Sequence, residues 1–64
     1  MRLTDFWERM DAALGAHYSH SWANDYVVAG LGGRTVQQAL ADGLDVKVIW
    51  RAVHHELGLP ATTR

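Results

Sequence analysis

The sequence predicts an all-α fold, a compact bundle of three to four short helices. Apolar residues recur at spacings of three and four in four successive segments, which is the pattern of amphipathic helices. Glycines stand where these segments end, and no stretch keeps the apolar and polar alternation of a half-buried strand for more than a few residues. With 64 residues the chain makes one domain, residues 1–64, whose small core gives marginal stability.

The first helix is expected to begin after Thr4, which can act as an N-cap, with Asp5 placed near the positive end of the helix dipole. Gly15 is expected to end it, because glycine accepts the left-handed conformation that closes many helices. The predicted inward face consists of residues at helical spacing: Phe6, Trp7, Met10, Ala13 and Leu14.

The second helix is expected to start near Ser19 or Ser21, with these serines as N-caps, and to run to Gly32 and Gly33. Gly30 would weaken it and could let a neighbouring segment approach closely. The residues that repeat every three or four positions, widened by their neighbours, make its apolar face: Tyr18, Trp22, Tyr26, Val27, Val28, Ala29 and Leu31.

The third helix is short. Thr35 and Gln38 fit a capping box, in which the threonine hydroxyl accepts from the amide three residues on and the glutamine side chain reaches back. Gly43 is expected to stop this helix after Val36, Ala39 and Leu40 have faced inward.

The fourth helix has the clearest pattern. Asp45 is a suitable N-cap, Gly58 a suitable end, and Pro60 cannot continue the helix. Residues 61–64 are expected to fray. One apolar stripe follows the spacing i, i+3, i+4, i+7 and i+11: Val46, Ile49, Trp50, Val53 and Leu57. Large residues of these faces predict a shared core, with at most one tryptophan partly exposed: Trp7, Trp22, Tyr26, Ile49, Trp50 and Val53.

The stretch "LGGRT", residues 31–35, has the composition of a phosphate-binding loop. A phosphate loop requires a preceding strand and the pattern G-x-x-x-x-G-K-[ST], and a dinucleotide fingerprint requires G-x-G-x-x-G, so neither motif is present. The favoured interpretation is a turn between helices: the glycines end one helix, Thr35 caps the next, and Arg34 offsets the negative end of a helix dipole. The alternative is an anion site made by Arg34 and the first amides of the third helix.

Composition excludes several classes of protein. The formal net charge of -1 lacks the basic excess usual for a dedicated nucleic-acid binder. The absence of cysteine excludes disulfides and thiolate metal sites and fits a reducing compartment. No secretory signal or membrane-spanning apolar run is present, so a cytoplasmic protein without membrane contact is expected.

Neither a metal site nor catalysis is expected, and no cofactor is implied. His17 and His20 are three residues apart, but a zinc site needs three or four converging ligands, and the adjacent His54 and His55 point in directions about 100° apart on a helix. The serines near His20 and Asp25 lack the convergence from separate elements that a catalytic triad requires. A helical chain this short is also expected to lack room for a pocket of ligand size.

Two function classes remain. The favoured hypothesis is a small non-enzymatic module that binds a protein partner of unknown identity, since large aromatics and arginines are enriched at interface hot spots. The alternative is a helix-turn-helix-like DNA-binding protein that uses the helices around residues 35–57, although Gln38 and Asp42 are polar where that motif needs apolar residues. The candidate residues for interaction or anion contact are Arg34, Lys47, Arg51 and His54.

Four segments, "MRLTDFWERM", "SWANDYV", "LGGRTVQQAL" and "VIWRAV", resemble an uncharacterised family of short bacterial proteins found mainly in high-GC Gram-positive bacteria. It is number three thousand and forty-six of the domain-of-unknown-function series. The resemblance covers nearly the whole chain and implies no activity, cofactor or site residue. The chain departs from the family pattern at Val46, where proline is frequent, and at His54, where cysteine is frequent; the second departure argues against an essential thiol there.

Overall fold

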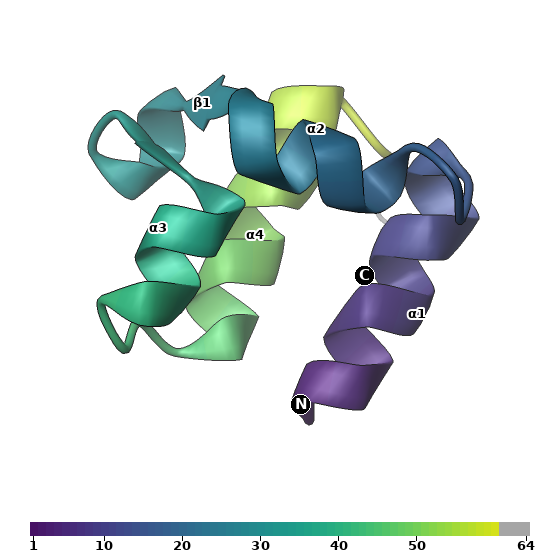
Figure 1. The fold of residues 1–64 in the computed structure, drawn as a ribbon, viewed down its shortest axis with the longest axis horizontal. Helices are drawn as coiled ribbons and strands as arrows, with labels where there is room; N and C mark the ends of the chain where they lie inside the picture. The colour runs from purple at the N-terminus through teal and green to yellow at the C-terminus, as the bar shows by residue number, and fades with distance from the viewer. Residues whose placement is uncertain (61–64) are drawn as a thin grey trace.

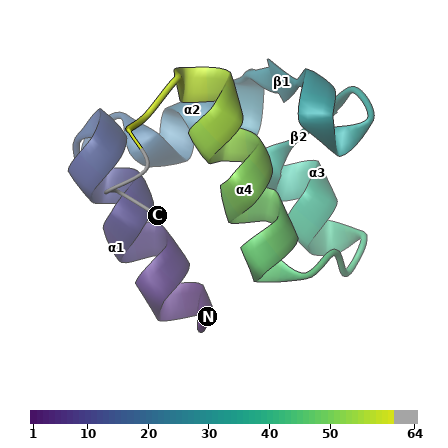
Figure 2. The ribbon, with the colours of Figure 1, turned by 180° about the vertical axis from the view of Figure 1, so that it is seen from behind.

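The computed structural model describes residues 1–60, in which four α-helices surround one core and a short two-stranded sheet joins two of them. Helix α2 crosses one end of the molecule, α1 descends from its start, and α3 and α4 lie side by side beneath its other end (Figures 1 and 2). The expectation for residues 61–64 lies outside the described residues. The elements are α1 (Leu3–Leu14), α2 (Ser19–Asp25), β1 (Val27–Val28), the 3-10 helix η1 (Ala29–Leu31), β2 (Arg34–Thr35), α3 (Val36–Ala41) and α4 (Val46–Leu57).

The helical prediction is confirmed for most of the described chain and is wrong between α2 and α3. Helix α2 stops at Asp25 rather than at the two glycines, and β1 and β2 pair antiparallel, with Val27 opposite Thr35 and Val28 opposite Arg34. Two consecutive β-branched valines disfavour a helix and suit a strand. Val28 is buried and Val27 exposed, which is the two-residue alternation of a sheet rather than a helical face.

Two predicted N-caps are also wrong. Arg2, not Thr4, precedes the first turn of α1, and the Asp5 carboxylate accepts a hydrogen bond of 3.3 Å from the Arg2 backbone N–H. Ser19 does not cap α2, because Tyr18 occupies that position. The Ser19 hydroxyl is fully buried and donates to the Asp11 carboxylate, which ties α2 to α1.

The caps predicted for α3 and α4 are confirmed. The Gln38 N–H donates to the Thr35 hydroxyl (3.1 Å), and the Thr35 N–H donates to the Gln38 side-chain oxygen (2.9 Å), which completes the capping box. The Asp45 carboxylate accepts from the Lys47 N–H at 2.8 Å. These local bonds hold both helix starts in place, so the stripe of α4 faces the core.

The core contains residues of every helix. Trp22, Ile49, Trp50 and Val53 are buried as predicted, and Trp7 is the partly exposed tryptophan. The prediction for Tyr26 is wrong: its side chain is 43% exposed, because the residue lies just beyond α2, where the chain turns into β1. The buried apolar residues are Phe6, Met10, Trp22, Ala23, Val28, Leu31, Val36, Ala39, Ile49, Trp50 and Val53.

Candidate functional site: a cationic groove between α1 and α4

The stretch "LGGRT" is a turn in which the arginine is already occupied. Gly32 and Gly33 have φ angles of 70° and 79°, as the favoured interpretation predicts, because the chain reverses there between η1 and β2. The Arg34 guanidinium donates to the Leu31 carbonyl at 3.0 Å and forms an ion pair of 3.0 Å with Asp42. The side chain therefore closes its own turn at the end of η1.

A groove lies elsewhere, between the outer side of α1 and one side of α4. It has a volume of about 610 Å³, and a neighbouring hollow of about 380 Å³ extends it along α1. The two parts share Arg9, Trp50 and Leu59, so we treat them together as the α1–α4 groove. The expectation that so short a chain has no hollow of ligand size is wrong. The lining residues are Met1, Arg9, Ala12, Ala13, Lys47, Trp50, Arg51, His54, His55, Gly58 and Leu59.

Helix α4 contributes a single stripe to this groove. Lys47, Trp50, Arg51 and His54 stand at i, i+3, i+4 and i+7, which places them along one side of the helix. Lys47 is the chain's single lysine. Lys47 and Arg51 are exposed, whereas Trp50 is only 3% exposed and belongs also to the core. The groove therefore has a base that is fixed by the core and a cationic edge.

The end of α4 places Leu59 in the groove. Gly58 has a left-handed backbone (φ 64°), its N–H donates to the His55 carbonyl, and the Leu59 N–H donates to the His54 carbonyl, each at 3.1 Å. This pair of bonds is a Schellman motif, which turns the chain back over the last turn of a helix. The Nε2 of His54 donates to the Pro60 carbonyl at 2.9 Å and holds the returning segment against the helix.

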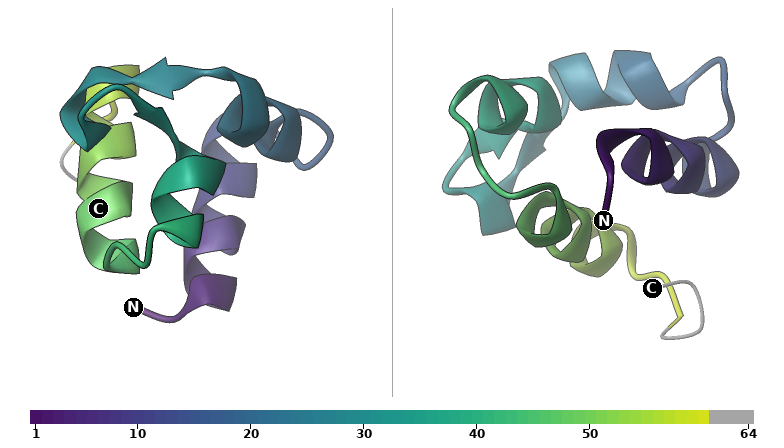
Figure 3. Two further views of the ribbon diagram at one scale, coloured as in Figure 1. Left: turned by 60° about the vertical axis from the view of Figure 1, so that its left-hand side comes forward. Right: turned by 90° about the horizontal axis from the view of Figure 1, so that it is seen from below.

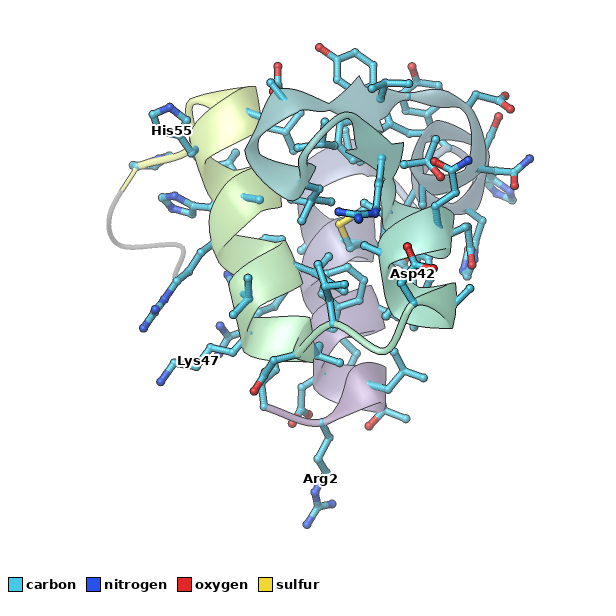
Figure 4. All side chains as sticks on the ribbon, turned by 90° about the vertical axis from the view of Figure 1, so that its left-hand side faces the viewer. Arg2, Asp42, Lys47 and His55 are labelled. Atoms are coloured by element: carbon cyan, nitrogen blue, oxygen red, sulfur yellow. The ribbon has the colours of Figure 1, made fainter. Side chains whose placement is uncertain are left out.

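The cations of the groove have no carboxylate partner within the described residues. Among residues 1–60, Arg34 and Asp42 form the single ion pair, so Arg9, Lys47 and Arg51 are all without one. Lys47 and His55 project from α4 on the side away from Asp42, and Arg2 projects from the N-terminal end (Figure 4). Six carboxylates already accept from groups other than the cationic side chains of the groove: Asp5, Asp11, Asp25, Asp42, Asp45 and Glu56.

The indole N–H of Trp50 is a hydrogen-bond donor without a partner within residues 1–60. Its Nε1–H is buried and has no acceptor among the described residues. A buried donor without an acceptor costs about 1–3 kcal/mol, so such groups are rare in folded proteins. Trp50 thus combines a core position, a place in the lining of the groove and an unused hydrogen-bond donor.

The described side chains do not converge as a metal site or a catalytic triad would require. No group of three or more histidine, aspartate or glutamate residues within residues 1–60 is placed to hold a metal ion. His20 instead stacks on Trp7, with ring centroids 4.1 Å apart. Ser19 is bonded to Asp11 and buried, so its hydroxyl is not presented to solvent as a nucleophile.

Two of the four residues singled out from the sequence lie exposed at the groove, namely Lys47 and Arg51. His54 also lines it, but its side chain is only 9% exposed and is bonded to Pro60. Arg34 lies outside the groove lining, on β2. Sequence reasoning missed Arg9 and Leu59: the first depends on the packing of α1 beside α4, and the second on the chain reversal at Gly58.

Fold and groove together define a small helical protein in which three of the five arginine and lysine side chains of residues 1–60 line one groove. The chain belongs to the family described as "Protein of unknown function (DUF3046)", which matches residues 1–62. Neither the curated proteins nor the solved structures contain a significant match to the chain. Within residues 1–60, no helix has the length and apolar character needed to cross a membrane.

Proposed function

We propose that this protein is a non-enzymatic interaction module that binds a segment of another protein in the α1–α4 groove. The observation that carries the proposal is the groove itself, with Trp50 at its base and beside it Arg9 and Arg51, which have no ion pair among residues 1–60. Tryptophan and arginine are the residue types most enriched at interface hot spots. The cysteine-free composition supports a cytoplasmic location for this binding.

The packing of α3 favours protein binding over the helix-turn-helix alternative. In that motif, the positions of Gln38 and Asp42 are apolar and packed between the two helices. Here both side chains are exposed, Gln38 is engaged in the capping box with Thr35, and Asp42 pairs with Arg34. Asp45 also places a carboxylate at the N-terminus of α4, the end that a recognition helix directs toward the bases.

Site-specific photo-crosslinking in cells tests the proposal. A photoreactive phenylalanine analogue replaces Ala12, which lines the groove, or Ala41, an exposed residue of α3 outside the groove lining. We expect irradiation to give a defined protein adduct from position 12 and none from position 41, with mass spectrometry identifying the adduct. Nucleic-acid adducts from either position, or equal protein adducts from both, would contradict the proposal.

A binding measurement distinguishes the DNA alternative. A duplex-binding protein with these few cations would depend on Lys47 and Arg51 for phosphate neutralisation, and its affinity would fall steeply with salt. We expect only weak duplex binding without sequence preference at physiological salt. Tight binding to a particular duplex, lost in Arg51→Ala without loss of folding, would establish the alternative.

A further inference from the structure

We infer that the occupant of the α1–α4 groove is an acidic peptide segment, one that carries carboxylates around at least one large apolar side chain. This inference rests on the proposed function and adds the chemistry of the partner. It follows from two features of the groove: its cations, which have no carboxylate partner among residues 1–60, and its apolar base.

The charges are segregated although the whole chain is nearly neutral. The chain carries a formal net charge of -1, yet Arg9, Lys47 and Arg51 line one groove together with His54 and His55. No aspartate or glutamate is among the residues lining either part of the groove. Within residues 1–60 no carboxylate competes for these cations, so complementary potentials would steer an acidic partner to this side of the molecule.

The apolar base of the groove favours a partner that carries apolar side chains in addition to carboxylates. The part along α1 is lined mainly by Ala12, Ala13, Trp50 and Leu59. The alanine methyl groups fill little of the space, and both alanines are exposed. A large apolar side chain placed there would remove these surfaces from water and gain the hydrophobic contribution of burial.

A nucleic acid matches these features less well than an acidic peptide does. A phosphate backbone has charges at regular spacing and no apolar side chains for the surface around Ala12 and Ala13. Three unpaired cations neutralise few phosphates, so nucleic-acid binding at physiological salt would be weak. Carboxylate side chains accept from guanidinium groups in bidentate geometry, which suits Arg9 and Arg51.

Selection from a random-peptide display library on the folded protein tests the inference, because the library presents every peptide chemistry to the groove at once. We expect the recovered peptides to be enriched in aspartate and glutamate around a leucine or an aromatic residue. Synthetic versions would then be titrated by fluorescence anisotropy against the wild type and four variants. Three variants change the groove (Arg9→Gln, Arg51→Gln and their combination), and Arg2→Gln removes the same charge at a side chain outside the groove lining.

The combined groove variant is expected to weaken binding about tenfold, since each exposed charge pair contributes modestly. Arg2→Gln is expected to leave affinity within about twofold, and replacing the peptide's glutamates by glutamine should weaken it as much as the combined variant does. Circular dichroism of each variant would confirm that it is folded. Affinity for the wild type should also fall as salt is added.

The alternative outcomes separate the two proposals. The Ala13→Trp variant places a large side chain in the groove and so blocks it. Neutral selected peptides that lose affinity for this variant, but keep their affinity for Arg9→Gln and Arg51→Gln, would overturn the acidic partner and leave protein binding in the groove intact. Peptides that bind equally well when Ala13 is blocked, or tighter binding of single-stranded oligothymidylate than of any selected peptide, would overturn both.

Discussion

The two sides of α4 are built differently. On one side η1 lies directly against the helix, and a Cβ added to Gly30 would come within 3.2 Å of the Ala52 Cβ. On the other side α1 stands further off, and Ala12, Ala13 and Arg9 border a groove instead of filling it. Figure 3 shows this arrangement from below, with α4 between the α3 and η1 region and α1.

Small residues have opposite effects on these two sides. At Gly30 the missing side chain allows a close backbone approach, and the contact stabilises the fold. At Ala12 and Ala13 the short side chains leave space, and Arg9 beside them has no ion pair with any other residue that the structure describes. A protein of this size can thus pack one side of a single helix closely and leave a groove along the other.

The largest effect is expected at Trp50, which belongs both to the core and to the lining of the groove. Truncation in Trp50→Ala should cost about 3–5 kcal/mol, the range for deletion of a buried large aromatic side chain. Folded domains have stabilities of about 5–15 kcal/mol, so this variant could lose its folded state altogether. Urea unfolding followed by circular dichroism measures the loss. A midpoint close to that of the wild type would show that Trp50 does not hold the core together.

Adding bulk to each side of α4 tests the comparison directly. Gly30→Leu should destabilise the protein by about 1–3 kcal/mol, because a Cβ at this exposed position would lie only 3.2 Å from the Ala52 Cβ and η1 would have to move away from α4. Ala13→Leu should change stability by less than about 0.5 kcal/mol, because the residue is exposed at the groove. Thermal melts of both variants give the comparison. Equal losses would mean that the groove side is packed as tightly as the η1 side.

Substitution at the N-cap of α3 should reduce folding stability more than substitution of the exposed Ala13 in the groove. Thr35→Ala removes the hydroxyl that accepts from the Gln38 N–H and should cost about 1 kcal/mol. Thr35→Ser keeps the acceptor and should recover most of that loss. Chemical unfolding of the two variants measures the difference, and equal stability of alanine and serine at this position would exclude the cap as the cause.

The smallest effect is expected at the exposed contact between Tyr26 and Glu56. The Tyr26 hydroxyl donates to the Glu56 carboxylate at 3.0 Å. This hydrogen bond, followed by the negative charge of Glu56, raises the pKa of Tyr26 above its ordinary value of 10.0. The stabilisation is present below pH 10.0 and is lost as the pH rises through the higher folded-state pKa.

Tyrosinate absorbance measures this shift. Subtracting the titration of Tyr26→Phe from that of the wild type isolates Tyr26, and Glu56→Gln should move its pKa back toward the ordinary value. A Tyr26 pKa that is unchanged by Glu56→Gln would show that the contact is absent in solution.

The sequence predicted a helix correctly where one segment contains both its N-cap and the residues that define its face or its end. For α4 the cap Asp45, the five-residue apolar stripe and the terminating Gly58 agree with one another, and the structure has the helix between those caps. The Thr35–Gln38 capping box likewise identified α3. Helix signals within about four residues of each other do not depend on the rest of the fold.

The segment between α2 and β2 could not be predicted in this way. Val27 and Val28 continue the helical spacing of α2, but their structure is decided by pairing with Thr35 and Arg34, which stand beyond two glycines. The prediction that Tyr26 is buried was wrong for the same reason, since a helix through these residues would have directed its side chain into the core. The groove also depends on tertiary packing, because Arg9 and Arg51 meet only when α1 and α4 are placed side by side.

Lys47 has a chemical consequence beyond its charge. It is the chain's single lysine and stands exposed in the lining of the groove. Reagents that acylate amines therefore have two targets in this chain, the Lys47 side chain and the Met1 α-amine, and both residues line the groove. The rate of Lys47 acylation becomes a direct measure of groove occupancy, since a bound segment that covers the amine should slow the reaction in proportion to the fraction bound.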